Sequence, residues 1–168
     1  MPEQEIRNSM DCSVDAYWKC VFDEEYNRRL YLEALKFREF KLLSQTDGAN
    51  GSRSRKVYLN PPAADLPGPV AKVVGDLSWT EEGTWDPKTG RYKFKVTPAS
   101  LPDKTRIDGE IWCEARGDKS CDRIAKAFVE VKVFMVGGIV EKRIIDDMKK
   151  SYENAARFTN QWVKEKGW

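Results

Sequence analysis

The sequence predicts an α+β fold in which a curved antiparallel β-sheet of about seven strands wraps around one long C-terminal α-helix. Three observations lead to it. The middle of the chain alternates apolar and polar residues with a period of two, turn residues interrupt this alternation at short intervals, and the period changes to 3.6 after residue 137. The residues after 137, at about 1.5 Å per residue, give a helix about 45 Å long. A helix of that length needs a large apolar surface, which the one-sided strands provide.

The C-terminal helix follows Gly137-Gly138 and is amphipathic throughout. Its polar face is rich in Lys, Arg, Asp and Glu, and the separation of the two faces is nearly complete. The residues on its apolar face are Val140, Ile144, Ile145, Met148, Tyr152, Ala155, Ala156, Phe158, Trp162 and Val163.

A strand and two short helices open the chain. Residues 6–12 alternate weakly, as in a short first strand. Ser13 suits a helix N-cap, with Asp15 in the first turn, and Asp23 starts a second helix that we expect to reach Leu35.

Antiparallel hairpins fill the region from Lys36 onward. Turn-forming residues separate most of the strands, and the prolines between 61 and 69 prevent ladder pairing over one loop, which residues 70–74 end with a helical turn. We expect strands at 36–45, 53–60, 76–86, 91–96, 106–115 and 125–133.

Composition limits the classes of function. The 168 residues suit one domain, 1–168, and the net charge of +2 comes from interleaved Lys, Arg, Asp and Glu, so we expect no nucleic-acid partner. No stretch approaches the roughly 20 apolar residues of a membrane span, and the N-terminus has no signal-like segment. We therefore expect a cytoplasmic protein.

The four cysteines give no metal-site pattern. There is no C-x-x-C pair and no histidine, so we expect no metal site and no cofactor. A hairpin centred on Gly117 would place Cys113 opposite Cys121, which leaves a disulfide open as one alternative. Reduced, half-buried thiols are the interpretation that we favour.

The element order, with three short sequence strings, resembles one known superfamily over essentially the whole chain. The strings are residues 13–18 (Ser-Val-Asp-Ala-Tyr-Trp), 23–26 (Asp-Glu-Glu-Tyr) and 136–141 (Val-Gly-Gly-Ile-Val-Glu). The superfamily is the START-like one, also called SRPBCC, birch-pollen-allergen-like or helix-grip, and the last string is similar to an uncharacterised bacterial branch of it. The resemblance implies a deep cavity between the concave face of the sheet and the long helix.

Relatives of this kind use the cavity for sterols, phospholipids, polyketides, plant hormones or aromatic rings. They include carriers, cyclases and aromatases, and oxygenase subunits. The oxygenase subunits need a histidine-rich iron site, which a chain without histidine cannot build.

Candidate ligand-binding residues are the inward positions of the strands and of the long helix. For each apolar one, ordinary core packing is the alternative. The candidates are Trp79, Glu81, Trp85, Tyr92, Phe94, Ile107, Ile111, Val129, Val131, Glu141, Met148 and Tyr152, with Phe158 further along the helix.

Polar residues on apolar faces are more informative, because burying a charge without a partner costs several kcal/mol. Glu81, Glu141, Arg38 and Arg55 are of this kind, and one or two of them could anchor the polar end of a ligand. The interpretation that we favour is structural: Glu141 interacts with the helix N-terminus, and the others form ion pairs or lie at sheet ends.

The function expected from the resemblance is the binding and transfer of a hydrophobic small molecule, lipid or sterol-like, without catalysis and with transient membrane contact. The C-terminal helix or the loop 61–74 would open the cavity. Two alternatives remain. One is a cyclase or aromatase in the same cavity that uses Glu81, Glu141 or Tyr152, and the other is a protein-interaction module.

Overall fold

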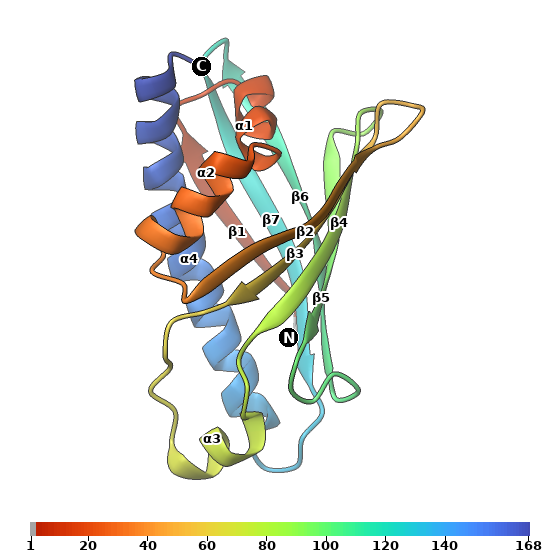
Figure 1. Cartoon of the computed structure of the whole chain (residues 1–168), viewed down its shortest axis with the longest axis vertical. Helices are drawn as coiled ribbons and strands as arrows, with labels where there is room; N and C mark the ends of the chain where they lie inside the picture. Colours follow the sequence, from red (N-terminus) through yellow and green to blue (C-terminus); the bar gives the residue numbers. More distant parts are fainter. Residues whose placement is uncertain (1–2) are drawn as a thin grey trace.

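A computed structural model describes residues 3–168 and confirms the predicted helix-grip architecture (Figure 1). Seven strands form one curved antiparallel sheet, and the long helix runs along its concave side. In chain order the elements are β1 (Glu3–Met10), α1 (Val14–Val21), α2 (Glu24–Arg29), η1 (Leu30–Ala34), β2 (Glu39–Asp47), β3 (Arg53–Asn60), α3 (Gly68–Val74), β4 (Trp79–Asp86), β5 (Arg91–Pro98), β6 (Thr105–Gly117), β7 (Ser120–Val131) and α4 (Gly137–Lys166).

The strand order is β1-β7-β6-β5-β4-β3-β2, so consecutive strands from β2 to β7 pair as hairpins and β1 closes the far edge. The register decides which residues share the concave face. Glu81 of β4 lies opposite Val57 of β3 and Val96 of β5, and Tyr92 lies opposite Trp85 and Ile111. The alternation in the sequence therefore predicts the inward residues correctly.

Helix α4 is held firmly at its C-terminal third. Ala155, Ala156, Thr159, Trp162 and Val163 are buried there, and the helix packs against β1, β7 and the η1 turn. It ends at Gly167, whose φ of 69° is the left-handed conformation that commonly closes a helix.

The start of α4 is fixed against the end of β7. Glu141 Oε1 accepts a hydrogen bond of 2.8 Å from the backbone N–H of Val131. Gly137 is buried so closely on this strand that a Cβ atom would lie 2.2 Å from the carbonyl oxygen of Val131. Glu141 thus joins helix to sheet, and its partner is the end of β7 rather than the helix N-terminus that the sequence predicts.

The two N-terminal helices begin where the sequence predicts, but the second changes type. Ser13 and Asp23 cap them by accepting the N–H groups of Ala16 and Tyr26. The α-helix predicted to reach Leu35 ends at Arg29 and continues as the π-helical η1, in which the N–H of Leu35 donates to the carbonyl oxygen of Leu30. This wider turn shifts the residues that face the sheet, which a 3.6-residue period does not predict.

Several strand boundaries also differ from the prediction. The first strand lies at Glu3–Met10 rather than 6–12, and β7 ends at Val131 rather than 133. Strand β4 begins at Trp79, not at 76, because the Asp76 side chain accepts the N–H of Ser78 and holds these residues in a turn.

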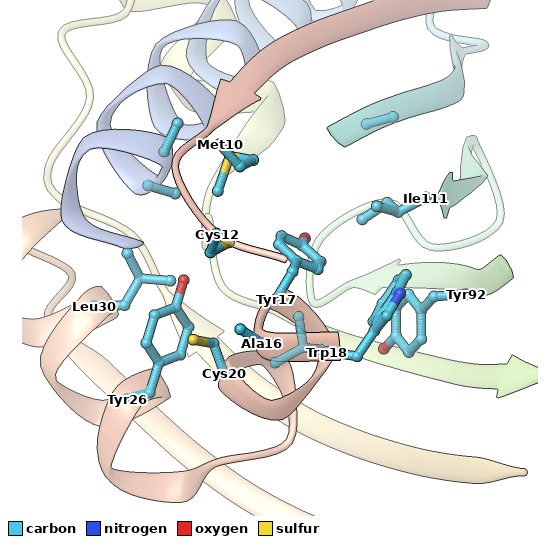
Figure 2. Packing of buried hydrophobic residues seen from close by; sticks show 14 of the residues in the cluster. Met10, Cys12, Ala16, Tyr17, Trp18, Cys20, Tyr26, Leu30, Tyr92 and Ile111 are labelled. Atoms are coloured by element: carbon cyan, nitrogen blue, oxygen red, sulfur yellow. The ribbon is translucent and has the colours of Figure 1, made fainter. Parts of the chain in front are cut away.

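The main hydrophobic core lies at the end of the molecule where α1 and α2 meet the last third of α4 (Figure 2). The side chains of Met10, Cys12, Tyr17, Trp18 and Tyr26 gather there. This core fixes α4 over one half of the sheet only.

The cysteines are all free. The β6–β7 register places Cys121 opposite Ala115, and Cys113 opposite Arg123. The two residues are therefore diagonal rather than directly opposite, because the turn lies between Gly117 and Ser120, but their thiols are close enough to interact.

A pair of adjacent glycines tests the contact at the start of α4. We expect Gly137→Ala to lower the free energy of unfolding by about 1–3 kcal/mol, because its methyl group overlaps the Val131 carbonyl. The matched control Gly138→Ala meets no atom within 4 Å and should leave stability unchanged or raise it by up to about 1 kcal/mol. Urea unfolding of both variants measures the difference. Equal stabilities would contradict the close contact.

Candidate functional site

The inward face of α4 has two halves that differ in burial. Between residues 138 and 154 no α4 side chain is buried, whereas five residues of the following turns are. The helical period nevertheless places the apolar residues of this first half on the face of α4 that is turned toward the sheet. The half-buried ones are Val140, Ile144, Ile145, Met148 and Tyr152.

The sheet opposite this half of α4 is also accessible. Trp79, Glu81 and Val96 lie on the concave face of β4 and β5 and are half-buried. An apolar surface that faces the interior and still meets solvent is unusual, because a packed core would cover both sides. Part of this surface therefore remains in contact with solvent, although Val96, Met148 and Tyr152 also pack against the hydrophobic core.

The predicted ligand-binding residues fall into two groups by burial. Tyr92, Phe94, Ile107, Ile111, Val129 and Val131 are buried, whereas Trp79, Glu81, Trp85, Glu141, Met148 and Tyr152 are half-buried. They do not form one site. Trp85 packs near Trp18 at the core end, while Glu141 lies at the opposite end of α4.

Two of the open hollows on residues 3–168 have volumes of about 230 and 270 Å³. The first lies between α1 and the ends of β3 and β4, and Trp85 is the one predicted ligand-binding residue in its wall. The second lies beside the proline-rich loop and includes Arg38. Neither is lined by α4, so neither is the enclosed cavity that the resemblance implies.

A polar cluster lies in the middle of the concave face, and we use this name for Arg55, Glu81 and Tyr92. Tyr92 Oη donates to Glu81 Oε1 at 3.1 Å and accepts from Arg55 Nε at 3.2 Å. An Arg55 nitrogen lies 3.6 Å from the same carboxylate oxygen. Two of the polar residues singled out in the sequence thus pair with each other, as the structural interpretation of an ion pair predicts.

Arg55 is fully buried among acceptors. Its Nη1 donates to the carbonyl oxygen of Val21 at 2.7 Å and to Asn27 Oδ1 at 3.0 Å. It therefore lies on β3, next to the edge strand β2, with α1 and α2 over it. Arg38, in contrast, is exposed before β2.

The negative charge of Glu81 acts on phenols from three elements. Burial is the main cause that raises the pKa of Tyr31, Tyr92 and Tyr152, and the negative charge of Glu81 is the next. The pKa of Tyr31 rises to about 12. Of these phenols, which come from η1, β5 and α4, that of Tyr92 donates a hydrogen bond to Glu81.

Tyr31 and Asn27 are the site residues that sequence reasoning did not identify. The spacing of Tyr26, Leu30, Tyr31 and Ala34 places Tyr31 only on the apolar side of the second helix, and Asn27 carries no local signal. The π-helical turn places the Tyr31 ring beside Phe37 and Phe40, next to the concave face.

The arrangement suits binding of a neutral polar group more than binding of a metal. Within residues 3–168 no group of three or more His, Cys, Asp or Glu side chains is placed to hold a metal ion. A half-buried carboxylate with one hydrogen bond from Tyr92 has further acceptor capacity, so a hydroxyl group of a ligand could donate to Glu81.

The described part of the chain has no helix of the length and apolarity that a bilayer crossing requires.

The buried tyrosines give a pH-dependent prediction. Tyr17, Tyr26, Tyr31, Tyr92 and Tyr152 have raised pKa values, chiefly through burial. In the unfolded chain they ionise near pH 10, so the stability that their neutral form gives is present below pH 10 and is lost as pH rises through the folded pKa.

We expect cooperative alkaline unfolding above about pH 10 to coincide with ionisation of these tyrosines. Absorbance at 295 nm and far-ultraviolet circular dichroism, recorded in parallel, measure both events. Ionisation of all five near pH 10 with an unchanged dichroism spectrum would contradict their burial.

Solved structures share this fold at low sequence identity. A protein of Thermus thermophilus aligns with a TM-score of 0.68 and 17% identity, over 99% of this chain and 100% of that one. The Zhui aromatase/cyclase of a Streptomyces species gives 0.68 and 10%, over 99% and 95%. Norcoclaurine synthase of Thalictrum flavum gives 0.64 and 16%, over 99% and 96%.

A START superfamily protein of Mycobacterium smegmatis aligns with a TM-score of 0.57 and 14% identity, over 92% of this chain and 97% of that one. Together these similarities confirm the START-like fold. No curated protein sequence gives a significant match. One family profile, described as "Protein of unknown function (DUF2505)", matches residues 5–163, and because this is nearly the whole chain, the protein belongs to the DUF2505 family.

Proposed function

We propose that the protein binds a neutral hydrophobic small molecule, lipid or sterol-like, between the sheet and the first half of α4, and transfers it. The observation that carries the proposal is the apolar stripe of α4 that faces the sheet and is only half-buried. Burial of apolar surface contributes about 25 cal/mol per Å², so a ligand that covers about 200 Å² of this stripe gains about 5 kcal/mol.

The polar cluster favours a neutral ligand with a hydroxyl group. Arg55 already donates to Tyr92, Val21 and Asn27 and pairs with Glu81, so few of its N–H groups are left for an anion. A fatty-acid carboxylate would also meet the negative charge of Glu81. A hydroxyl group can instead donate to Glu81, as Tyr92 does.

The proline-rich loop and α3 are the part that we propose opens. They lie beside the start of α4 at one end of the molecule (Figure 1). Val70 and Val74 of α3 are buried, and the loop carbonyl of Asp65 accepts a hydrogen bond of 3.2 Å from Arg143. This exposed hydrogen bond is weak, so the main cost of opening is the exposure of Val70 and Val74, which a bound ligand would have to offset.

Known proteins of similar fold support binding of small molecules. One of the norcoclaurine synthase structures, with a TM-score of 0.65 to this chain, holds dopamine and hydroxybenzaldehyde, and another structural relative is an aromatase/cyclase. These names also favour a second candidate, a cyclase-like enzyme in which Glu81, hydrogen-bonded to Tyr92, acts as a general base.

Filling the space beneath α4 tests the binding proposal. Native mass spectrometry and organic extraction identify what co-purifies, and fluorescently labelled cholesterol and labelled undecanoic acid serve as probes. We expect wild-type protein to bind the cholesterol probe more tightly than the acid. Met148→Trp should weaken cholesterol binding about tenfold or more, because the indole occupies the surface that the ligand covers.

The control is Lys149→Trp, which adds the same ring to the exposed face of α4. It should bind as wild type does, and circular dichroism confirms that both variants are folded. The proposal is wrong if no apolar molecule co-purifies and neither probe binds, or if Met148→Trp binds as tightly as Lys149→Trp.

The enzyme candidate has a separate outcome. Chemical change of the co-purified molecule during incubation, lost in Glu81→Gln while probe binding persists, would favour catalysis over transfer. Because Glu81→Gln leaves Arg55 without its counter-charge, its thermal stability must be recorded beside its activity.

A further inference from the structure

The loop between β7 and α4 exposes two large apolar side chains at once. Phe134 is 91% exposed and Met135 is 82% exposed. Met135 has a φ of 67°, a left-handed conformation that is unfavourable for a residue other than glycine. The loop therefore presents apolar surface where a water-exposed turn would favour polar residues or glycine.

More exposed apolar side chains lie at the same end of the molecule. The large hydrophobic residues of positions 3–168 that are strongly exposed are Leu43, Val73, Phe134, Met135 and Ile139. Ile139 begins α4 directly after the loop, and Val73 belongs to α3, which lies at the same end in Figure 1. We call Val73, Phe134, Met135 and Ile139 the apolar tip. Leu43 lies apart from it, on the edge strand β2.

Basic side chains flank the apolar tip. Lys72 precedes Val73 in the chain. Lys132 lies two residues before Phe134, and Lys142 lies three residues after Ile139. The backbone N–H of Lys132 donates to the carbonyl oxygen of Lys104, so a fourth exposed lysine lies beside the loop. Lys132 and Lys142 also pair with Glu130 and Asp146 in water, through exposed ion pairs that a stronger anionic surface can replace.

The apolar tip lies at the end of α4 where the inward stripe begins. Ile139 itself is on the outer side of the helix, because its neighbours three and four residues on are Lys142 and Arg143, whereas Val140, Ile144 and Met148 face the sheet. The tip and the stripe therefore lie at the same end of the helix, on different faces of it.

We propose that the apolar tip inserts into the surface of a membrane that contains anionic lipid, and that the ligand enters or leaves the protein there. This inference rests on the proposed binding of a hydrophobic molecule. The tip projects as a convex loop, whereas a protein partner would have to supply a matching hollow. Protruding apolar side chains beside lysines are suited to the boundary between acyl chains and anionic headgroups.

Vesicle co-sedimentation tests the proposal. The vesicles are phosphatidylcholine alone and phosphatidylcholine with about 30% phosphatidylserine. We expect wild-type protein to sediment with the anionic vesicles, less with the neutral ones, and less at high salt. Phe134→Ser with Met135→Ser should weaken binding to anionic vesicles about tenfold or more.

The matched control is Leu43→Ser, which removes an exposed apolar side chain far from the tip. It should sediment as wild type does. Absence of wild-type binding to either vesicle, or equal losses in Leu43→Ser and the double variant, would overturn the proposal. So would a wild-type dimer in analytical ultracentrifugation that the double variant abolishes, because the tip would then bind a second copy.

Binding of labelled cholesterol distinguishes the membrane-docking proposal from the ligand-binding proposal on which it rests. The double variant should bind the probe in solution as wild type does but deliver it to anionic vesicles more slowly. If wild-type protein binds the probe and ignores vesicles, membrane docking is wrong and ligand binding stands. If it binds vesicles but no probe, docking stands and the proposed function fails.

Discussion

The attachment of α4 at its two ends is the constraint on which the rest of this structure depends. The C-terminal third packs into the main core through Trp162 and Val163, and the N-terminal turn rests on β7 through Gly137 and Glu141. A stiff helix of 30 residues attached in this way spans the concave face without having to touch it in between. The apolar side chains of that segment are only half-buried, although Met148 and Tyr152 also pack against the hydrophobic core.

Burial of charge is the second constraint, and it explains why the concave face is polar at its centre. Arg55 could not be buried alone, because an unpaired cation costs several kcal/mol. Glu81, Tyr92, Asn27 and a carbonyl oxygen of α1 surround it. The same charge fixes α1 and α2 against β3 and β4, so the polar cluster stabilises the fold as well as offering Glu81 to a ligand. Both roles follow from one set of contacts.

The sequence was sufficient for the architecture because periodicity reports which side faces the interior. The one-sided alternation of β5 and β7 and the long stripe of α4 depend on nothing outside those segments. Tyr31 packs against the core, as the apolar set of the second helix predicts, but its place beside the concave face depends on the π-helical turn at Leu30. The pairing of Arg55 with Glu81 needed the β3–β4 register, and the position of Cys113 relative to Cys121 needed the exact turn between β6 and β7. Local patterns do not contain such long-range geometry.

The half-buried apolar stripe of α4 and the exposed apolar tip are best understood together. Exposure of apolar area to water is unfavourable by about 25 cal/mol per Å², so each surface needs a reason to persist. If the stripe of α4 were unrelated to the tip, two separate reasons would be required. They lie at the same end of α4, because Ile139 of the tip and Val140 of the stripe both belong to its first turn. A molecule that moves between a bilayer and the interior at this end passes from one apolar surface to the other over a short distance.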